Sequence, residues 1–231
     1  MKMIVDARQQ YFPEFADLAT QMNHDLRSPL TAICSYAECL ALGNATEPAA
    51  RERYARVVIA EARRLGRMAS NFVVLSAPQQ DHGLEQLDLS EVLRDALEEL
   101  REVLELQETV VDFTEPARSA LVTWHRPVLL HLLIATLESV LGHSGSRASV
   151  AISFIPQVRD VAVLVGLTDE GAHPPDTRSF AFRAAARLVG TRGGSLLLLD
   201  GAQPRLRLVV PRSGALYVMP GNAAPALGKS A

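Results

Sequence analysis

The sequence is poor in cysteine, in aromatic residues and in charge of one sign. Only two of its 231 residues are cysteines, and aromatic residues make up 5% of the chain. Lys and Arg number 23 against 26 Asp and Glu, which gives a formal net charge of −3. This balance offers neither nucleic acid nor an anionic membrane the basic surface that attracts it. We therefore expect neither of these as a partner.

The two cysteines, Cys34 and Cys39, fall in one segment with helical periodicity. On a single helix their side chains point in different directions, so we expect no disulfide between them. The sequence also lacks a spacing of His, Cys, Asp or Glu that is typical of metal ligands, and we expect no metal site in the chain itself. These features are typical of a reduced, cytoplasmic protein.

A long apolar run is also missing. The most apolar stretch, 128–141, contains His131 and Glu138 and is shorter than a helix that spans a membrane. The first residues, MKMIVD, reach a charge almost at once and do not have the pattern of a secretion signal. We expect a protein that has no membrane span and receives its input through another molecule.

Apolar residues recur at steps of three and four along two long segments, which predicts amphipathic helices from about residue 7 to 42 and from about 47 to 76. Gly43 and Pro48 flank the short turn between them. Two long helices joined in this way form a helical hairpin. A hairpin alone cannot bury both apolar stripes, so we expect a homodimer in which two hairpins form a four-helix bundle. The alternative is a monomer whose second domain covers the stripe.

The pattern changes after the hairpin. Residues 78–83 have the composition of a linker, and 213–231 form a tail rich in Ala, Gly and Pro that we expect to be flexible. Helices are predicted over 89–106, 126–141 and 178–190, and strands over 109–114, 120–123, 150–155, 161–167, 195–199 and 205–210. This order predicts an α+β sandwich with helices on one face of a mixed sheet. The expected domains are therefore 1–78 and 84–212, followed by the tail.

The segment 23–33, NHDLRSPLTAI, places His24 beside Asp25 on the first predicted helix. A neutral imidazole nitrogen can attack an electrophilic phosphorus when the other ring nitrogen keeps its proton. Asp25 can accept a hydrogen bond from that second nitrogen, which fixes the tautomer and raises the nucleophilicity of the ring. Ser28 lies one turn further on the same face. Pro29 removes the amide that would bond to the carbonyl of Asp25, so we expect the helix to bend there.

This segment resembles the phosphoacceptor box in the dimerisation and histidine-phosphotransfer domain of two-component sensor histidine kinases. The resemblance continues through 33–38, ICSYAE, and on the second helix through 59–65, IAEARRL, and 71–76. It implies that His24 carries a phosphoryl group and that Asp25 supports it. The alternative is a histidine that merely faces solvent. In the family, the position of Ser28 often holds a Thr or Asn that orients water for removing phosphate from a response regulator, so serine weighs against phosphatase activity.

Residues 84–212 resemble the ATP-binding catalytic domain of the same kinases in the order and type of their elements. Residues 128–136 occupy the place of the asparagine box, 165–171 resemble the strand that ends in the first glycine box, and 188–196 resemble the closing helix-to-strand turn. The resemblance implies that the α+β sandwich has the architecture of a kinase-type ATPase-like domain.

The residues that bind MgATP in this family are largely replaced. His131 and Ala135 stand where the family has two asparagines, and alanine offers no oxygen to magnesium. Imidazole is a poor ligand for magnesium as well, so we expect His131 to be structural. Residues 179–182, SFAF, replace the glycine-rich turn that would approach the phosphates. The segment between Asp169 and this turn is also much shorter than a typical ATP lid.

Asp169 and Gly171 are what remains of the first glycine box, whose next glycine is replaced by His173. By resemblance, Asp169 accepts a hydrogen bond from an adenine amine. The alternative is a carboxylate that caps the loop before Gly171. We therefore expect at most a residual nucleotide site and no ordinary MgATP chemistry.

Three functions follow from these observations. In the first, the chain is a phosphorelay protein whose His24 exchanges a phosphoryl group with the aspartate of a response-regulator receiver domain, while the second domain serves as a docking scaffold. The receiver is expected to supply its own magnesium. Histidine phosphotransferases built like a degenerate kinase dimer are an analogous case. The alternatives are an active soluble histidine kinase that phosphorylates His24 from ATP, and a regulatory pseudokinase that pairs with a true sensor kinase.

Overall fold

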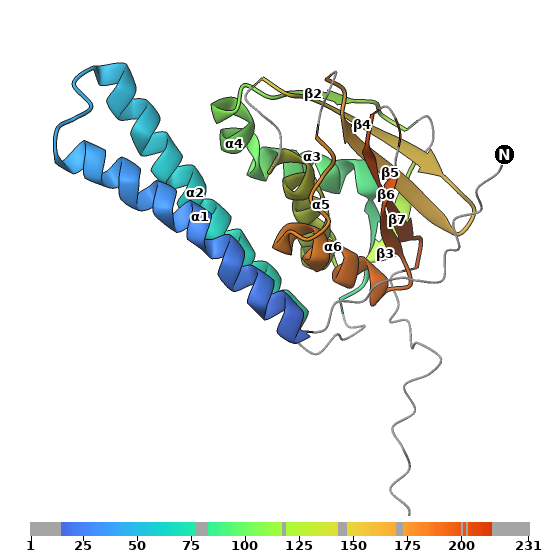
Figure 1. Cartoon of the computed structure of the whole chain (residues 1–231). Coiled ribbons are helices and arrows are strands. Elements are labelled where there is room, and N and C mark those ends of the chain that lie inside the picture. Colours follow the sequence, from blue (N-terminus) through green and yellow to red (C-terminus); the bar gives the residue numbers. More distant parts are fainter. Residues whose placement is uncertain are drawn as a thin grey trace, which may run out of the picture.

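The computed structural model of the chain describes residues 15–76, 83–116, 119–142, 147–169, 173–199, 201 and 203–213. A long helical hairpin lies along one side of an α/β domain, whose helices stand between the hairpin and a sheet (Figure 1). Nearly all of the predicted linker and all of the predicted tail beyond Ser213 lie outside the described residues.

The hairpin consists of α1 (Phe15–Ala41) and α2 (Pro48–Ser76), close to the predicted bounds. Gly43 in the turn has a φ of 69°, a left-handed conformation that costs glycine little. The backbone N–H of Leu42 bonds to Glu38 at 2.9 Å, which satisfies one of the last carbonyls of α1. Pro48 begins α2, where a missing N–H removes no helical hydrogen bond.

The α/β domain is built around a mixed five-stranded sheet in the order β2-β4-β5-β7-β6. β2 pairs with β4 in parallel, and the other neighbours are antiparallel. Its elements are β1 (Glu85–Asp88), α3 (Leu89–Glu99), α4 (Arg101–Leu106), β2 (Val110–Phe113), β3 (Leu121–Trp124), α5 (Arg126–Leu141), β4 (Ser149–Pro156), β5 (Asp160–Leu167), α6 (Phe180–Gly190), β6 (Ser195–Leu199) and β7 (Arg205–Pro211). The predicted α+β class, with helices on one face of a mixed sheet, is confirmed.

The prediction of a single helix over 89–106 was wrong. The chain forms α3 and α4, with Leu100 between them at φ −98° and ψ −1°. The side chain of Leu100 is fully buried, so the residue between the two helices belongs to the core. The strand β1 was not predicted at all. Its four residues are extended because they pair antiparallel with β3, which no local pattern reveals.

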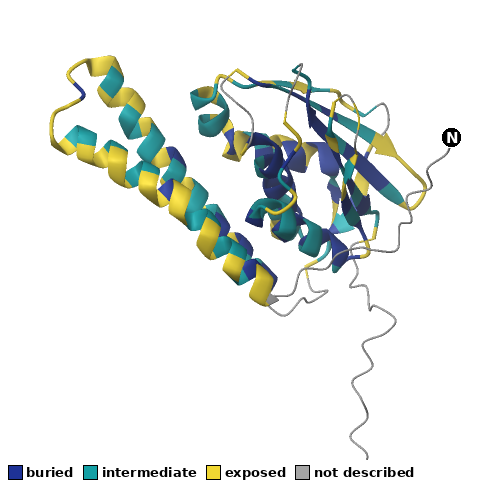
Figure 2. Ribbon diagram, viewed as in Figure 1, coloured by how far each residue is buried: buried dark blue, intermediate teal, exposed yellow. Residues whose placement is uncertain are grey.

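The core lies between the sheet and its covering helices and reaches the hairpin. Trp124, Leu129, Ile152 and Leu188 are among its largest buried side chains. Leu18 of α1 and Met68 and Leu75 of α2 belong to the same apolar cluster. In Figure 2 most buried positions of the two helices lie on the side toward the α/β domain, and Ala45 is buried in the turn of the hairpin. Burial of one such side chain stabilises the fold by roughly 1.5–3 kcal/mol.

The α/β domain covers only part of the apolar stripe of the hairpin. Leu30 and Ile59, near the middle of α1 and α2, keep 48% and 44% of their surface exposed. The alternative, in which the second domain covers the apolar stripe, therefore holds at one end of the hairpin only. There Leu18, Met68 and Leu75 are buried. The exposed apolar side chains nearer the middle remain available to a second hairpin, and the homodimer stays a prediction.

Candidate functional site

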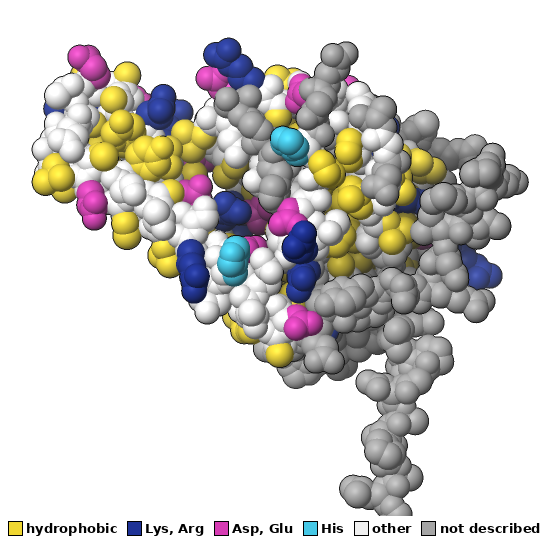
Figure 3. All heavy atoms as spheres, viewed as in Figure 1, with side chains coloured by type: hydrophobic (Ala, Val, Ile, Leu, Met, Phe, Trp, Pro, Cys, Tyr) yellow, Lys and Arg dark blue, Asp and Glu magenta, His cyan; other side chains and the backbone are white. Residues whose placement is uncertain are grey.

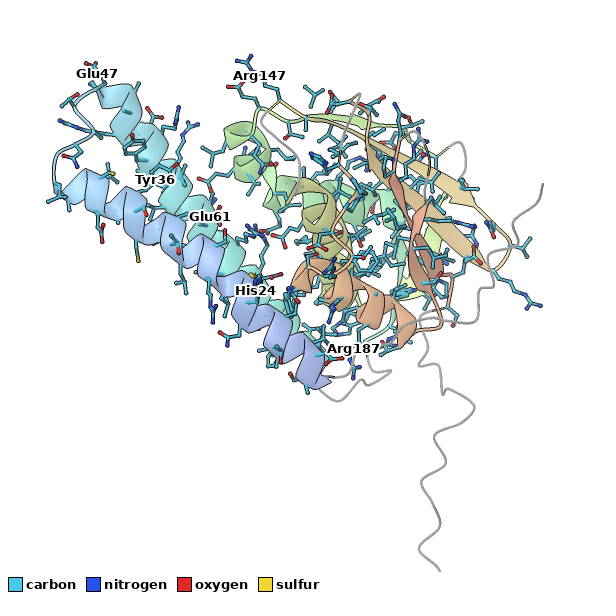
Figure 4. The ribbon with its side chains drawn as sticks, viewed as in Figure 1. His24, Tyr36, Glu47, Glu61, Arg147 and Arg187 are labelled. Atoms are coloured by element: carbon cyan, nitrogen blue, oxygen red, sulfur yellow. The ribbon has the colours of Figure 1, made fainter. Side chains whose placement is uncertain are left out.

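His24 lies on the part of α1 that adjoins α6, and its side chain is 76% exposed (Figure 4). Its Nδ1 is 3.1 Å from Oδ1 of Asp25, which is the contact expected from the sequence. Within the described part of the chain, Nε2 of His24 has no hydrogen-bond partner. This nitrogen is therefore open to a group that approaches from solvent.

Three groups hold the carboxylate of Asp25. Besides His24, the amide of Gln21 donates to Oδ1 at 2.8 Å, and the backbone N–H of Phe180 donates to Oδ2 at 2.7 Å. Phe180 is the first residue of α6, where backbone N–H groups have no partner within the helix. Asp25 therefore links α1 of the hairpin to the N-terminus of α6 in the α/β domain, where a negative charge is favourable.

Sequence reasoning missed both Gln21 and Phe180. The spacing could have found Gln21, because it precedes Asp25 by one turn on the same helix face. No local signal indicates Phe180, which is 155 residues away from Asp25 in the chain.

Ser28 and Pro29 lie where the sequence predicted, on the same helix as His24. Ser28 is exposed, whereas Pro29 is buried. α1 continues through Pro29 without a break in the helix, and the bend expected there stays a prediction. The roles of His24, Asp25 and Ser28 in phosphoryl chemistry stay predictions as well.

An open hollow adjoins His24 on the side of the α/β domain. It is lined by Gln21 and His24 of α1, by residues 174–178 and by Leu198 of β6. Residues 174–178, just before α6, thus lie beside the histidine. Figure 3 shows basic side chains on this face of the molecule, around the place where α1 and α6 adjoin.

Residues at the expected nucleotide site are engaged in structural contacts. Oδ2 of Asp169 accepts a hydrogen bond of 2.8 Å from the backbone N–H of Ser149, at the start of β4. The alternative given above was a carboxylate that caps the loop before Gly171, whereas the partner here is the first residue of β4, so the role of Asp169 stays a prediction. Ala135 and Phe180 are buried in one apolar cluster. Gly171 lies outside the described residues.

His131 is half-buried on α5, and its Nδ1 has no partner among the described residues. Burial lowers the pKa of His131, and the nearby charge of Glu99 opposes that shift only in part. The half-buried imidazole is therefore neutral near pH 7, and its structural role stays a prediction.

Across the described ranges, no group of three or more His, Cys, Asp or Glu residues is placed to hold a metal ion. Cys34 and Cys39 are both free thiols. None of the helices in the described part combines the length and apolarity needed to cross a membrane.

Residues 16–81 match the family model of the His Kinase A (phospho-acceptor) domain. No curated protein matches the chain. Among solved structures, the histidine kinase AdeS of Acinetobacter baumannii aligns with a TM-score of 0.57 at 15% identity, over 82% of this chain and 98% of that one. The histidine kinase ThkA in complex with the response regulator protein TrrA aligns with a TM-score of 0.55 at 14% identity, over 85% of this chain and 61% of that one. The nucleotide-free catalytic domain of the histidine kinase ThkA aligns with a TM-score of 0.50 at 14% identity, over 56% of this chain and 97% of that one.

The hairpin is therefore similar to phospho-acceptor domains, and the α/β domain has the fold of histidine kinase catalytic domains. The family model covers the hairpin alone, and over these residues it supports the resemblance to two-component sensor histidine kinases.

Proposed function

We propose that the chain is a phosphorelay protein whose His24 exchanges a phosphoryl group with the aspartate of a response-regulator receiver domain. The observation that carries this proposal is the exposed imidazole of His24, with Nδ1 held by Asp25 and Nε2 open to solvent. A carboxylate on Nδ1 keeps the proton there and leaves the lone pair on Nε2.

The transfer needs little from the protein besides this arrangement. When a receiver donates, the lone pair of Nε2 forms the N–P bond, the P–O bond to the receiver aspartate breaks, and its electron pair returns to that carboxylate. Asp25 stabilises the positive charge that develops on the ring. The reverse step moves the phosphoryl group back to the aspartate, so the same site serves both directions.

We infer that the α/β domain fits MgATP poorly, which favours transfer over kinase activity. Ala135 offers no oxygen to a metal ion and is fully buried. The buried side chain of Phe180 lies where the family has a glycine-rich turn, and a ring there prevents close approach of the backbone to phosphates. Asp169 uses one carboxylate oxygen to hold Ser149.

A response regulator is the partner that the comparisons support best. One of the matched structures is that of the histidine kinase ThkA in complex with the response regulator protein TrrA. A receiver that docks on this chain would approach the exposed His24 and bring its own magnesium. The exposed Leu30 and Ile59 favour the homodimer as the functional form.

The proposal is tested with the purified full chain in two arms. The first arm supplies labelled MgATP, and the second supplies receiver domains that already carry labelled phosphate. His24→Ala removes the acceptor, and His173→Ala serves as the matched control because His173 is another exposed histidine. We expect the wild type and His173→Ala to gain label from the receivers and none from MgATP. His24→Ala should gain label from neither source.

The other outcomes separate the alternatives. Label from MgATP that depends on His24 would make the chain an active kinase. No label in either arm, from folded protein and a broad set of receivers, would contradict the phosphorelay proposal. A regulatory pseudokinase would then predict that His24→Ala leaves the signalling output of the cell unchanged.

A further inference from the structure

The segment before α6 brings an arginine into the hollow beside His24. Arg178 lines this hollow together with His24 and Gln21. Its side chain is exposed, and within the described residues its guanidinium forms no hydrogen bond or ion pair. The carboxylate of Asp176 also lines the hollow, but its Oδ1 accepts the backbone N–H of Arg178 at 2.8 Å. The hollow therefore contains a histidine and a cation that is free to bind an anion.

Hydrogen bonds fix the position of this segment relative to His24. The hydroxyl of Ser179 donates to the carbonyl of Asp176 at 2.8 Å and accepts from the N–H of Phe182 at 3.3 Å. The next residue, Phe180, donates its N–H to Oδ2 of Asp25 at 2.7 Å. Asp25 holds the imidazole of His24 through its other oxygen. One carboxylate thus sets the position of both the phosphoacceptor and the turn that carries Arg178.

We propose that Arg178 binds the oxygens of the phosphoryl group on Nε2 of His24. This inference rests on the proposed role of His24. A phosphoryl group carries close to two negative charges, and the planar guanidinium group can donate two parallel hydrogen bonds to its oxygens. The α/β domain then contributes a phosphoryl-binding residue to a site on the hairpin.

The charge balance of the site supports this assignment. The carboxylate of Asp25 lies beside His24 and that of Asp176 lines the same hollow, so a phosphoryl group on the ring meets negative charge from both. Arg178 offsets that repulsion from the side of the α/β domain. Arg27, one turn beyond His24 on α1, is exposed and offers a second cation from the same helix.

Phosphoramidate tests the inference without a receiver. The lone pair of Nε2 forms the N–P bond while the P–N bond of phosphoramidate breaks and ammonia leaves. ³¹P NMR follows the initial rate of phosphohistidine formation in the full chain. The variants are Arg178→Ala, Arg178→Lys, His24→Ala and Arg147→Ala. Arg147 is a matched control because it is exposed and lies far from His24, at the opposite edge of the α/β domain (Figure 4).

We expect Arg178→Ala to lower the rate about tenfold, since a hydrogen-bonded charge contact to phosphate is lost. Arg178→Lys should retain part of the rate because it keeps the charge and loses the paired donors. Arg147→Ala should match the wild type. Circular dichroism of each variant checks that the fold is intact.

Two results would overturn the inference, and they differ. If the wild type gains phosphate on His24 and Arg178→Ala gains it equally fast, Arg178 does not bind the phosphoryl group, and the proposed function stands. If the wild type gains no more phosphate than His24→Ala, His24 is not an acceptor, and the proposed function fails together with the inference.

Discussion

Arg67 of α2 and Glu138 of α5 form an ion pair between the hairpin and the α/β domain, with 2.8 Å between Nε and Oε1. Their side chains are only 12% and 10% exposed. A second pair, Arg63 with Glu102, joins α2 to α4 nearby in a more exposed position. Because Arg67 and Glu138 are largely withdrawn from water, each of them depends on the other for compensation of its charge.

Arg67→Ala should lower the free energy of unfolding by about 3 kcal/mol, because it leaves Glu138 buried without its partner. Arg63→Ala is the matched control, and its exposed pair predicts a loss of about 0–1 kcal/mol. Urea titration followed by circular dichroism measures both. Equal losses in the two variants would show that the Arg67–Glu138 pair does not couple the domains.

Asp25→Ala should slow phosphoryl transfer to His24 by about 10²-fold, because the ring loses the group that fixes its tautomer. The same change removes the acceptor for the N–H of Phe180 and should destabilise the first turn of α6 by about 1 kcal/mol. Transfer kinetics measure the first effect, and hydrogen exchange of the Phe180 amide measures the second. Gln21→Ala is the control, since it removes one donor to Asp25 and keeps both other contacts. Unchanged exchange at Phe180 in Asp25→Ala would exclude this link between the domains.

His131 should make the protein less stable in mild acid. Burial lowers the pKa of His131 in the folded state, while the unfolded chain keeps a value near 6.5. Above that value both states are neutral, and the group has no effect on the pH dependence. Below it the unfolded state binds the proton first, so the free energy of unfolding falls until the folded pKa is reached.

The measurement compares the free energy of unfolding at about pH 7.5 and about pH 5.5 for the wild type and His131→Leu. The loss between the two pH values should be smaller in the variant, which has no group to protonate at this position. A variant that loses as much stability as the wild type would assign the acid sensitivity to other residues.

The exposed apolar part of the hairpin should form the dimer contact. A charge at Leu30 or Ile59 would have to be buried in a four-helix bundle, so Leu30→Glu and Ile59→Glu should shift the chain toward the monomer by at least about tenfold in dissociation constant. Analytical ultracentrifugation measures the association. Val158→Glu is the matched control, because Val158 is an exposed apolar residue in the β4–β5 turn, away from the hairpin. A monomeric wild type would rule out the predicted bundle.

Local patterns predicted most of the secondary structure. The helix over 126–141 and the strand over 195–199 were predicted with the bounds that the structure shows, because periodicity and turn residues are properties of neighbouring positions. The predicted helices and strands are wrong where contacts with residues distant in the chain determine the local structure. The helix over 89–106 breaks at Leu100, whose side chain belongs to the core, and β1 is extended only because β3 pairs with it.

The sequence by itself determined that His24, Asp25 and Ser28 share one helix, whose geometry sets their relative positions. The prediction that residues for MgATP are replaced also came from the sequence, through its resemblance to the kinases. Only the tertiary structure decided what surrounds His24, Asp25 and Ser28. The bond from Phe180 to Asp25 joins residues 155 apart, and the pair of Arg67 with Glu138 joins residues 71 apart. Such contacts depend on how two separately patterned domains pack together, and no local periodicity encodes that packing.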